Sequence, residues 1–317
     1  MSSDTRTHVT PRLSAEELVA AVPGLESIAS VEPESLSNLP GASLTSDGLL
    51  GALRWARQRV DAGASGVVLV QGTDTLEESA FLLDLYWDRT NPLVFTGAMR
   101  PPQRAGSDGP ANLLASIATA ADAVSEDLGV LVVMNDEIHA AARVSKQDAM
   151  SVDAFRSPVF GPLGRVVEDR PTYANRQQRR HLLPMPERTE RPDPRVALVA
   201  THLGDAGEVL DLVLDHGYDA AVLTAFGAGH VSTATAEAVS RATERMPVVF
   251  ASRTGAGTTA ESMYGFPGSE TDLVRRGAIA AGWLPPVKAR LLLWALIRSG
   301  STQEGVREEF RLRRRLS

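Results

Sequence analysis

The sequence predicts an α/β protein in which helices cover both faces of parallel sheets. Three observations support this fold class. Short apolar runs rich in Val and Leu alternate along the chain with longer segments of helical period. These runs show little polar alternation, which is typical of strands buried on both faces. The alternation breaks once, over residues 170–195, where Pro, Arg and Gln are frequent. The βαβα order therefore favours two domains, a larger N-terminal one and a smaller C-terminal one.

Each apolar run is short enough to be one buried strand, and each helical segment has the length of an ordinary helix. Ser14 with Glu17, and Thr75 with Glu78, fit the capping-box pattern at helix starts, and Asp108 is a predicted N-cap. The predicted strands are residues 66–70, 93–96, 129–134, 196–200, 220–224 and 248–251, and the main predicted helices are residues 47–62, 75–89, 109–124, 207–216 and 233–245.

The break in the pattern divides the chain. We expect an N-terminal domain over residues 1–172, a linker over 173–194 and a C-terminal domain over 195–317. The first structured element predicted is a helix from Ser14, although doubly wound domains usually open with a core strand whose turn feeds the site. The sequence has no such strand upstream of Ser14, so the N-terminal sheet is expected to lack its first strand.

Composition excludes several classes of function. The net charge of the 317-residue chain is −7, which gives no electrostatic basis for binding nucleic acid. The basic stretch 311–315 is predicted to be a solvated tail. The absence of cysteine excludes disulfides, thiolate metal sites and a cysteine nucleophile, and is compatible with the cytoplasm. No run is long enough to span a bilayer, and no signal peptide is visible at the N-terminus. Residues 290–297 are predicted to form a core or oligomer-packing helix.

The stretch 66–79 carries the clearest chemical signal. An apolar run ends abruptly at Thr73 and Asp74, and a helix start follows at once. This order brings a hydroxyl, a carboxylate and free backbone N–H groups to the carboxyl end of a buried strand, where open α/β sheets bind ligands. The other predicted strands also end in small or polar residues, which turns alone explain in most cases.

Thr73 supplies a hydroxyl that can attack a carbonyl once a base takes its proton. Lys146, soon after the strand over residues 129–134, is the candidate base, and a lysine takes this role when desolvation or a nearby cation lowers its pKa. Asp74 is expected to orient the lysine or to bind an ammonium group of a substrate. The residues alone equally allow Thr73 and Asp74 to be helix caps and Lys146 to be a surface lysine.

Several segments in series resemble the bacterial-type L-asparaginase family, and the resemblance covers the chain from about Thr10. The segments are Gly72-Thr73-Asp74-Thr75-Leu76-Glu77-Glu78, Gly97-Ala98-Met99-Arg100-Pro101, Ser107-Asp108-Gly109-Pro110-Ala111-Asn112-Leu113, Val132-Val133-Met134-Asn135-Asp136-Glu137-Ile138, Arg143-Val144-Ser145-Lys146, Tyr218-Asp219-Ala220-Ala221-Val222 and Phe226-Gly227-Ala228-Gly229-His230.

The resemblance implies hydrolysis of L-asparagine without a cofactor, with L-glutamine as a second candidate substrate. It implies a flavodoxin-like N-terminal domain and a catalytic Thr73, Asp74 and Lys146. It assigns substrate binding to Thr73 and Asp74 as well as to the residues Gly72, Ala98, Ser43 and Glu270. Family members are typically homotetramers built from dimers, with sites shared between protomers. Glu270 matches, less securely than the others, the acidic residue that the neighbouring protomer contributes.

The sequence departs from the family pattern in three places. The Gly-Gly-Thr-Ile motif, whose threonine is usually treated as the nucleophile, is absent, so we expect it to be encoded just upstream of Met1. Gly41 stands where the family usually has a serine that grips the substrate carboxylate, and Ser43 is near enough to replace it. Gln71 replaces the more usual histidine. Loss of the first strand removes both a ladder partner and the threonine that is usually treated as the family's nucleophile.

Other functions remain as alternatives. A non-catalytic relative would bind a small amino acid through Asp74 without hydrolysing it, and an amidase subunit of a tRNA-dependent amidotransferase would use the same fold. The stretch 255–260 matches a loose dinucleotide fingerprint, but the residues after it break any helix. The six histidines are scattered, so no metal site is predicted.

Overall fold

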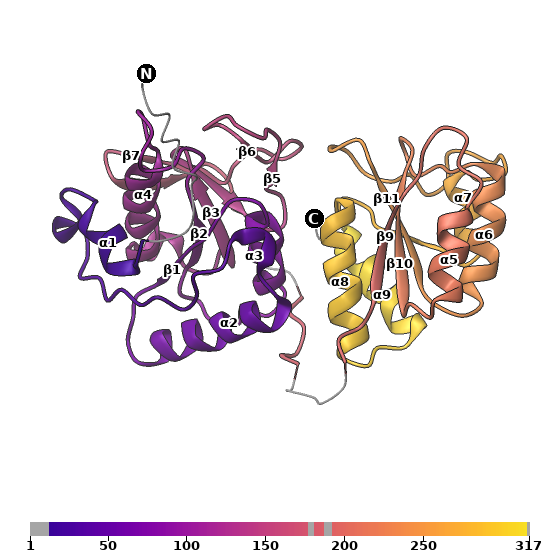
Figure 1. The fold of residues 1–317 in the computed structure, drawn as a ribbon, viewed down its shortest axis with the longest axis horizontal. Coiled ribbons are helices and arrows are strands. Elements are labelled where there is room, and N and C mark those ends of the chain that lie inside the picture. The colour runs from indigo at the N-terminus through magenta and orange to yellow at the C-terminus, as the bar shows by residue number, and fades with distance from the viewer. Residues whose placement is uncertain (1–12, 177–180, 187–191, 316–317) are drawn as a thin grey trace, which may run out of the picture. The chain divides into compact units, whose positions relative to one another are not determined.

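The computed structural model describes residues 13–176, 181–186 and 192–315. The chain forms two compact units, residues 1–179 and residues 180–317. Each unit contains its own sheet, which confirms the predicted α/β class (Figure 1).

The sheet of the first unit has six strands in the order β1-β2-β3-β4-β7-β8. Strands β1, β2 and β3 are parallel and confirm three of the predicted strands, whereas β4, β7 and β8 add antiparallel pairs that the sequence analysis did not predict. The last of them begins at Arg170, so regular structure continues into the stretch predicted to be irregular. The bounds are β1 Val67–Val70, β2 Leu93–Thr96, β3 Val130–Met134, β4 Glu137–Ala140, β7 Gly164–Val167 and β8 Arg170–Tyr173.

The antiparallel strands are joined by two tight hairpin turns. Met134 pairs with Glu137, and the intervening Asn135 and Asp136 have φ values of 52° and 59°. The turn between β7 and β8 is built in the same way, with positive φ at both of its central residues. Positive φ at both central positions defines a type I′ turn, for which Asn and Asp are favoured. The Asn-Asp pair is therefore a hairpin signal, although the sequence analysis interpreted it only as the end of a strand.

Helices cover both faces of this sheet. Figure 1 shows α4 and α3 on opposite sides of the strands, and the α4 residues Ala115 and Ala120 share a core cluster with Val94 and Leu131 of the sheet. Ser14 forms the predicted capping box with Glu17. The bounds are α1 Ala15–Ala20, α2 Ser46–Asp61, α3 Leu76–Asp84 and α4 Gly109–Ala121, with short 3₁₀ turns at Leu25–Ser27, Gly41–Ser43 and Ala123–Ser125.

Strand β1 lies at the end of the sheet order. Within the described residues it pairs only with β2, and Val70 is 45% exposed. A separate hairpin, formed by β5 (Ser145–Lys146) and β6 (Phe155–Arg156), carries the candidate base.

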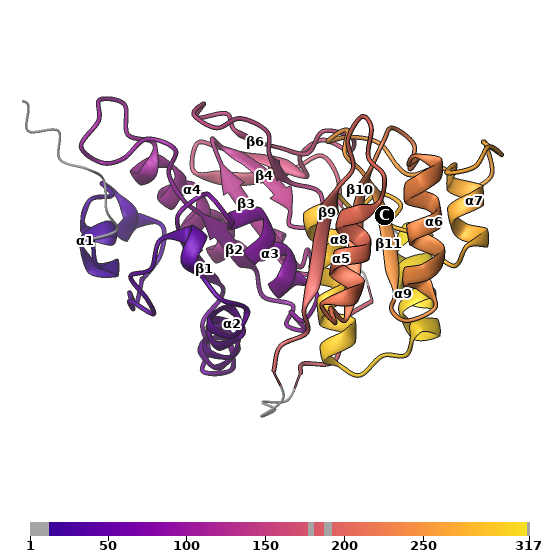
Figure 2. The ribbon, with the colours of Figure 1, turned by 45° about the vertical axis from the view of Figure 1, so that its right-hand side comes forward.

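The second unit contains an all-parallel sheet in the order β12-β11-β10-β9. Helix α8 lies on one side of its strands and α5 with α6 on the other (Figure 1, and in a turned view Figure 2). The bounds are β9 Val196–Ala200, β10 Ala220–Ala225, β11 Val248–Ser252, β12 Ile279–Ala280, α5 Glu208–Asp215, α6 Thr233–Thr243, α7 Glu270–Arg275, α8 Pro286–Arg298 and α9 Gln303–Arg315.

The basic C-terminal stretch is not the solvated tail that its charge predicted. It belongs to α9, where Arg313 is only 3% exposed. The Arg313 guanidinium donates to Glu309 at 2.7 Å and to the carbonyl of His181 at 2.6 Å. Glutamates one turn away therefore bind the arginines within the unit. Among the helices described, none is both long and apolar enough to cross a membrane.

Candidate functional site

The turn after β1 brings the predicted hydroxyl and the predicted amine together. Thr73 follows the strand end and is half-buried, and Lys146 reaches it from β5. The distance from Lys146 Nζ to Thr73 Oγ1 is 3.0 Å. This contact is the geometry that proton transfer between a hydroxyl and a base requires.

Asp74 is the third predicted member of the cluster and the most open to solvent. Its side chain is 66% exposed, and Oδ1 lies 3.7 Å from Lys146 Nζ. At this exposure water screens much of the attraction between the two charges. The carboxylate therefore has room to accept an ammonium group of a ligand while Lys146 remains bound to Thr73.

Thr75 corrects one prediction about this turn. It is the residue before α3, but its side chain makes no capping hydrogen bond, so the Thr75 capping box is not formed. Its hydroxyl instead donates to the Gly41 carbonyl at 2.8 Å, and Gln71 Nε2 lies 3.4 Å from the same hydroxyl. The side chain thus joins the strand-end turn to the 3₁₀ turn Gly41–Ser43.

Gly41 lies where no side chain fits. A Cβ at this position would stand 2.8 Å from the Gly72 carbonyl oxygen, closer than real Cβ contacts. This close approach explains why glycine, rather than the serine usual in the family, stands there. Ser43 lies in the same 3₁₀ turn with an exposed side chain.

A buried asparagine organises the second turn of the site, which carries Ala98. Asn112 is 2% exposed and donates to the Gly97 carbonyl and to Asp108, each at 3.0 Å. Asp108, the predicted N-cap, precedes α4 but makes no cap bond there, and accepts instead from the Met99 and Arg100 N–H groups. The sequence analysis missed Asn112, although an amide on the apolar face of a predicted helix was a usable signal.

Glu77 is a further residue that the sequence analysis did not single out. It lies in the first turn of α3, and its Oε2 accepts the backbone N–H of Lys146 at 2.9 Å. The backbone and the side chain of Lys146 are therefore both bound to the segment 73–77.

Glu270 belongs to the second unit and is completely buried. Its Oε1 accepts the N–H groups of Met263 and Tyr264 at 2.8 Å, and Oε2 lies 3.2 Å from His230 Nε2. Burial acts to raise the pKa of Glu270, but the hydrogen bonds from Tyr264, Met263 and His230 outweigh it and hold the pKa below its ordinary value. The carboxylate thus fixes the loop before α7, and its predicted contact with a neighbour's substrate stays a prediction.

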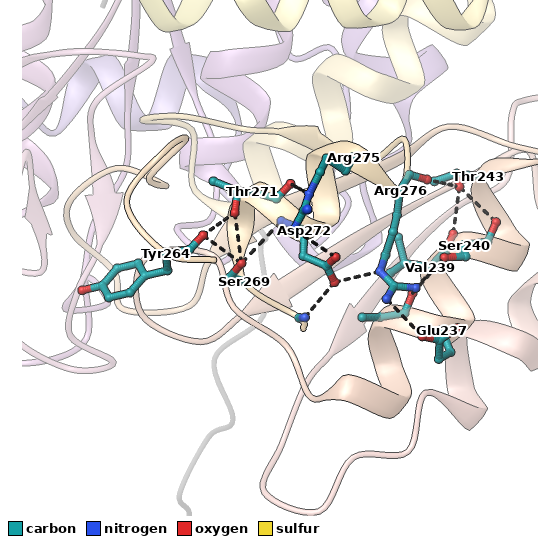
Figure 3. Close-up of polar contacts among 12 residues, drawn as sticks. Glu237, Val239, Ser240, Thr243, Tyr264, Ser269, Thr271, Asp272, Arg275 and Arg276 are labelled. Carbon is teal, nitrogen blue, oxygen red and sulfur yellow. Dashed lines mark hydrogen bonds and ion pairs between the residues drawn. The ribbon is translucent and has the colours of Figure 1, made fainter. Parts of the chain in front are cut away.

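Figure 3 shows how α7 itself is held. Arg276, just after the helix, contacts Asp272 at 2.8 Å and Glu237 of α6 at 3.0 Å. Asp272 Oδ2 also accepts the Gly268 N–H at 2.9 Å, and Ser269 caps the helix. Burial acts against the charge of Asp272, yet these partners lower its pKa below the ordinary value. The loop over residues 263–268 is therefore bound to the start of α7 and, through Arg276, to α6.

No group of three or more His, Cys, Asp or Glu side chains suited to a metal ion occurs in the described parts of the chain. The glycine-rich stretch 255–260 forms bends and no regular helix. Of the predicted site residues, the structure brings Thr73, Asp74 and Lys146 together.

Comparisons with known proteins show the family to which both units are related. The family described as "Asparaginase, N-terminal" matches residues 1–179, and "Glutaminase/Asparaginase C-terminal domain" matches residues 195–310. A "Probable L-asparaginase periplasmic" of Haemophilus influenzae is 33% identical over 285 residues, which cover 89% of this chain and 80% of that protein. One of the subunits of the glutamyl-tRNA(Gln) amidotransferase of Methanosarcina barkeri is 30% identical over 315 residues, which cover 94% and 72%.

Among solved structures, the chain is similar to that of a "Probable Cytoplasmic L-asparaginase" from Campylobacter jejuni. The TM-score is 0.85 at 29% identity, and the match covers 94% of this chain and 93% of that chain. The likeness thus extends over both units.

Proposed function

We propose that this chain, which belongs to the asparaginase family, hydrolyses the side-chain amide of L-asparagine to L-aspartate and ammonia. The observation that carries the proposal is the 3.0 Å contact between Thr73 Oγ1 and Lys146 Nζ at the carboxyl end of a parallel strand. The family relationship supports an asparaginase-type hydrolase, and the contact supplies a hydroxyl already bound to an amine.

In the proposed reaction, neutral Lys146 accepts the proton of the Thr73 hydroxyl, and the Thr73 oxygen attacks the amide carbon of the substrate. The C–N bond then breaks, and ammonia leaves with the proton that Lys146 returns, so an aspartyl ester remains on Thr73. Water hydrolyses this ester, which releases L-aspartate and restores the hydroxyl. Backbone N–H groups at the start of α3 favour the developing oxyanion because they carry the positive end of the helix dipole.

Asp74 is proposed to bind the substrate's ammonium group, since its carboxylate is the exposed charge beside Thr73. Gly72, Ala98 and Ser43 are proposed to complete the binding site on neighbouring turns. Glutamine is a second substrate to test, because the matching C-terminal family is described by both activities. One methylene changes binding by only about 1–3 kcal/mol, so the pocket contacts must decide the preference.

The direct test measures ammonia released from L-asparagine and L-glutamine by the purified protein and by Lys146→Met. We expect turnover that Lys146→Met abolishes while the circular dichroism spectrum is unchanged. Asparagine binding by calorimetry without ammonia release would instead favour the non-catalytic amino-acid-binding alternative. Ammonia release only with a tRNA-dependent partner protein would favour the amidotransferase alternative, which the similarity to the Methanosarcina protein supports.

We further propose a homotetramer, or a homodimer, whose sites are shared between protomers, with Glu270 contributed by the neighbour. Mass measurement in solution tests the assembly, and mixed oligomers test the sharing. In a mixed dimer of Lys146→Met and Glu270→Gln protomers, one shared site carries both changes and the other carries neither. Activity should therefore return on coexpression of two inactive variants, whereas unshared sites would stay inactive.

The cytoplasm is the proposed compartment, supported by the structural neighbour named as cytoplasmic, while the Haemophilus relative is named as periplasmic. Cell fractionation with an antibody to the chain distinguishes the two compartments.

A further inference from the structure

Lys146 is bound at both of its ends by one short segment. Its side-chain Nζ lies 3.0 Å from Thr73 Oγ1, and its backbone N–H donates to Glu77 Oε2 at 2.9 Å. Thr73 and Glu77 are separated by only three residues, and the second lies in the first turn of α3. The position of the amine relative to the hydroxyl therefore depends on how firmly α3 holds the backbone of Lys146.

The hairpin that carries Lys146 has little regular pairing of its own. Strands β5 and β6 contain two residues each and form a sheet separate from the six-stranded one. Gln147 N–H donates to the Ala154 carbonyl at 2.7 Å, and Asp148 accepts two N–H groups within the connecting loop. Isolated two-stranded hairpins are marginally stable in water, so contacts from outside must fix the hairpin on the site.

At the other end of the hairpin, buried side chains provide one such contact. His139 of β4 is fully buried, and its Nδ1 lies 3.0 Å from Ser157 Oγ, directly after β6. His139 Nε2 is 3.4 Å from Glu137 Oε2. These residues line up as a serine, histidine and carboxylate, but Ser157 is only 6% exposed, so the set joins the hairpin to the sheet rather than meeting substrate.

Glu77 provides the contact at the Lys146 end. Its carboxylate lies in the first turn of α3, and its Oε2 accepts the Lys146 backbone N–H at 2.9 Å. Thr75, the residue before the helix, turns its hydroxyl to Gly41 instead. The first turn of α3 therefore uses Glu77 to hold a neighbouring segment.

We propose that Glu77 is a positioning residue, which sets the distance between the Lys146 amine and the Thr73 hydroxyl by holding the Lys146 backbone. Its hydrogen bond is to the Lys146 backbone, whereas the Lys146 side chain contacts Thr73. Its effect on turnover rests on the proposed function, in which Lys146 is the base, whereas its effect on the Lys146 backbone does not. Hydrogen exchange at Lys146 tests the hold of Glu77 on the backbone, and steady-state kinetics test its effect on turnover. Either hypothesis can therefore be contradicted without the other.

The first measurement is amide hydrogen exchange of the Lys146 N–H, followed by NMR or on peptides spanning residues 143–156. Glu77→Ala removes the acceptor, and we expect exchange at Lys146 to become at least about tenfold faster, as for a locally opened amide. Glu77→Gln retains a side-chain oxygen acceptor of the same length and should retain most of the protection. Glu78→Ala, in the same helical turn, is the matched control. Equal protection in Glu77→Ala and the wild type overturns the proposal whether or not the protein is active.

The second measurement separates kcat from KM for L-asparagine. Misplacing a catalytic group by about 1 Å can cost on the order of 10²-fold, so Glu77→Ala should lower kcat by about 10- to 100-fold. KM should change by less than about threefold, because the binding groups stay in place. Glu77→Gln should recover kcat to within a few-fold of the wild type. A rise in KM at constant kcat contradicts a positioning role.

A folding defect is recognised from the melting temperature. If Glu77→Ala does not fold, Glu77→Asp replaces it, because the shorter side chain keeps the charge but withdraws the acceptor by one methylene. An Asp variant with normal kcat and normal Lys146 exchange overturns the proposal. A wild type that releases no ammonia contradicts the proposed function, and the exchange measurement still decides the role of Glu77.

Discussion

The two units each present the carboxyl ends of parallel strands, but they use the polar residues there differently. In the first unit the Thr73 hydroxyl faces the amine of Lys146 at 3.0 Å. In the second unit the comparable hydroxyl, on Thr201 after β9, donates to the Thr224 carbonyl at 2.6 Å. Arg253, after β11, donates to the Thr201 carbonyl and stacks over the Phe226 ring. The strand-end threonine thus contacts a side-chain amine in one sheet and a backbone carbonyl in the other.

The position of a threonine at the end of a strand is therefore not enough to define the chemistry of its hydroxyl. Both threonines follow Val-rich strands, and turns favour such residues for conformational reasons alone. What separates them is the partner that the rest of the fold delivers. The Thr201 hydroxyl donates its hydrogen bond to a carbonyl oxygen, which is not a base that can remove the proton. Lys146 Nζ donates to the Thr73 hydroxyl, and in its neutral form the same amine is a base within reach of that proton.

The largest effect tests this comparison directly. Thr73→Val removes the hydroxyl but keeps the volume, and kcat for L-asparagine should fall on the order of 10³-fold or more, as for other residues that act in one catalytic unit. Lys146→Met should have a similar effect, and the double variant should be little worse than either single one. Thr201→Val makes the same change in the other sheet and should alter kcat by less than about threefold. Equal losses of kcat in Thr73→Val and Thr201→Val would contradict the distinction between the strand ends of the two sheets.

The next effect concerns stability of the second unit. Glu270→Ala removes the acceptor of two backbone N–H groups and the partner of His230, all inside the unit. Breaking such a buried charged network costs about 3 kcal/mol, so the free energy of unfolding should fall by about that amount. Urea denaturation measures it, with Glu270→Gln as the milder change because one acceptor oxygen remains. A loss of activity with unchanged stability would place Glu270 at the substrate instead.

The pH dependence of stability follows from the same carboxylates. The folded-state pKa values of Glu270 and Asp272 lie below their ordinary values, 4.5 and 3.8, so the folded state binds fewer protons than the unfolded state. Their contribution is fully present above these ordinary values and is lost as pH falls toward the lowered pKa values. Melting temperatures measured from pH 7 down to pH 3 should fall, and Glu270→Gln should flatten the decline. An unchanged slope in that variant argues against the carboxylate as its source.

Much of the fold follows from the chain because its strands are buried on both faces. The apolar runs that became β1, β2, β3, β9, β10 and β11 carry enough Val and Leu to mark them without knowledge of their partners. Strands β4, β7 and β8 were missed because each contains a charged residue, Glu137, Arg165 and Arg170 respectively, and therefore forms no continuous apolar run, so their signal lay in the turn residues instead. The basic residues of α9 were misread because charge alone does not reveal glutamates one helical turn away.

The residues of the candidate site likewise divide into those that the sequence predicted and those that it did not. Thr73 and Asp74 are adjacent in sequence, so a single motif identifies them. Lys146, 73 residues further along, was a candidate base because it soon follows a predicted strand, and the family resemblance implied the same role. Glu77 was missed because its role depends on the backbone N–H of a distant segment, which no local pattern encodes. Asn112 was missed although its place on the apolar face of a predicted helix was a local signal, because its partner, the Gly97 carbonyl, lies in another turn. Gly41 was identified as a departure from the family, but only the close approach of Gly72 explains it.

The smallest expected effect is a change in the stability of the first unit alone. Glu168 and Asp169 form the turn between β7 and β8 with φ values of 50° and 57°. Positive φ costs a residue with a side chain roughly 1 kcal/mol, which glycine avoids, so Asp169→Gly should stabilise the first unit by up to about that amount. In a domain of this size the melting temperature should rise by about 2–4 °C. Calorimetry should show this shift only in the unfolding transition of the first unit. That transition is identified as the one that does not move in Glu270→Ala, which changes the second unit. If both transitions move together, the two units unfold as one, and the strand ends of the two sheets can no longer be treated as independent regions.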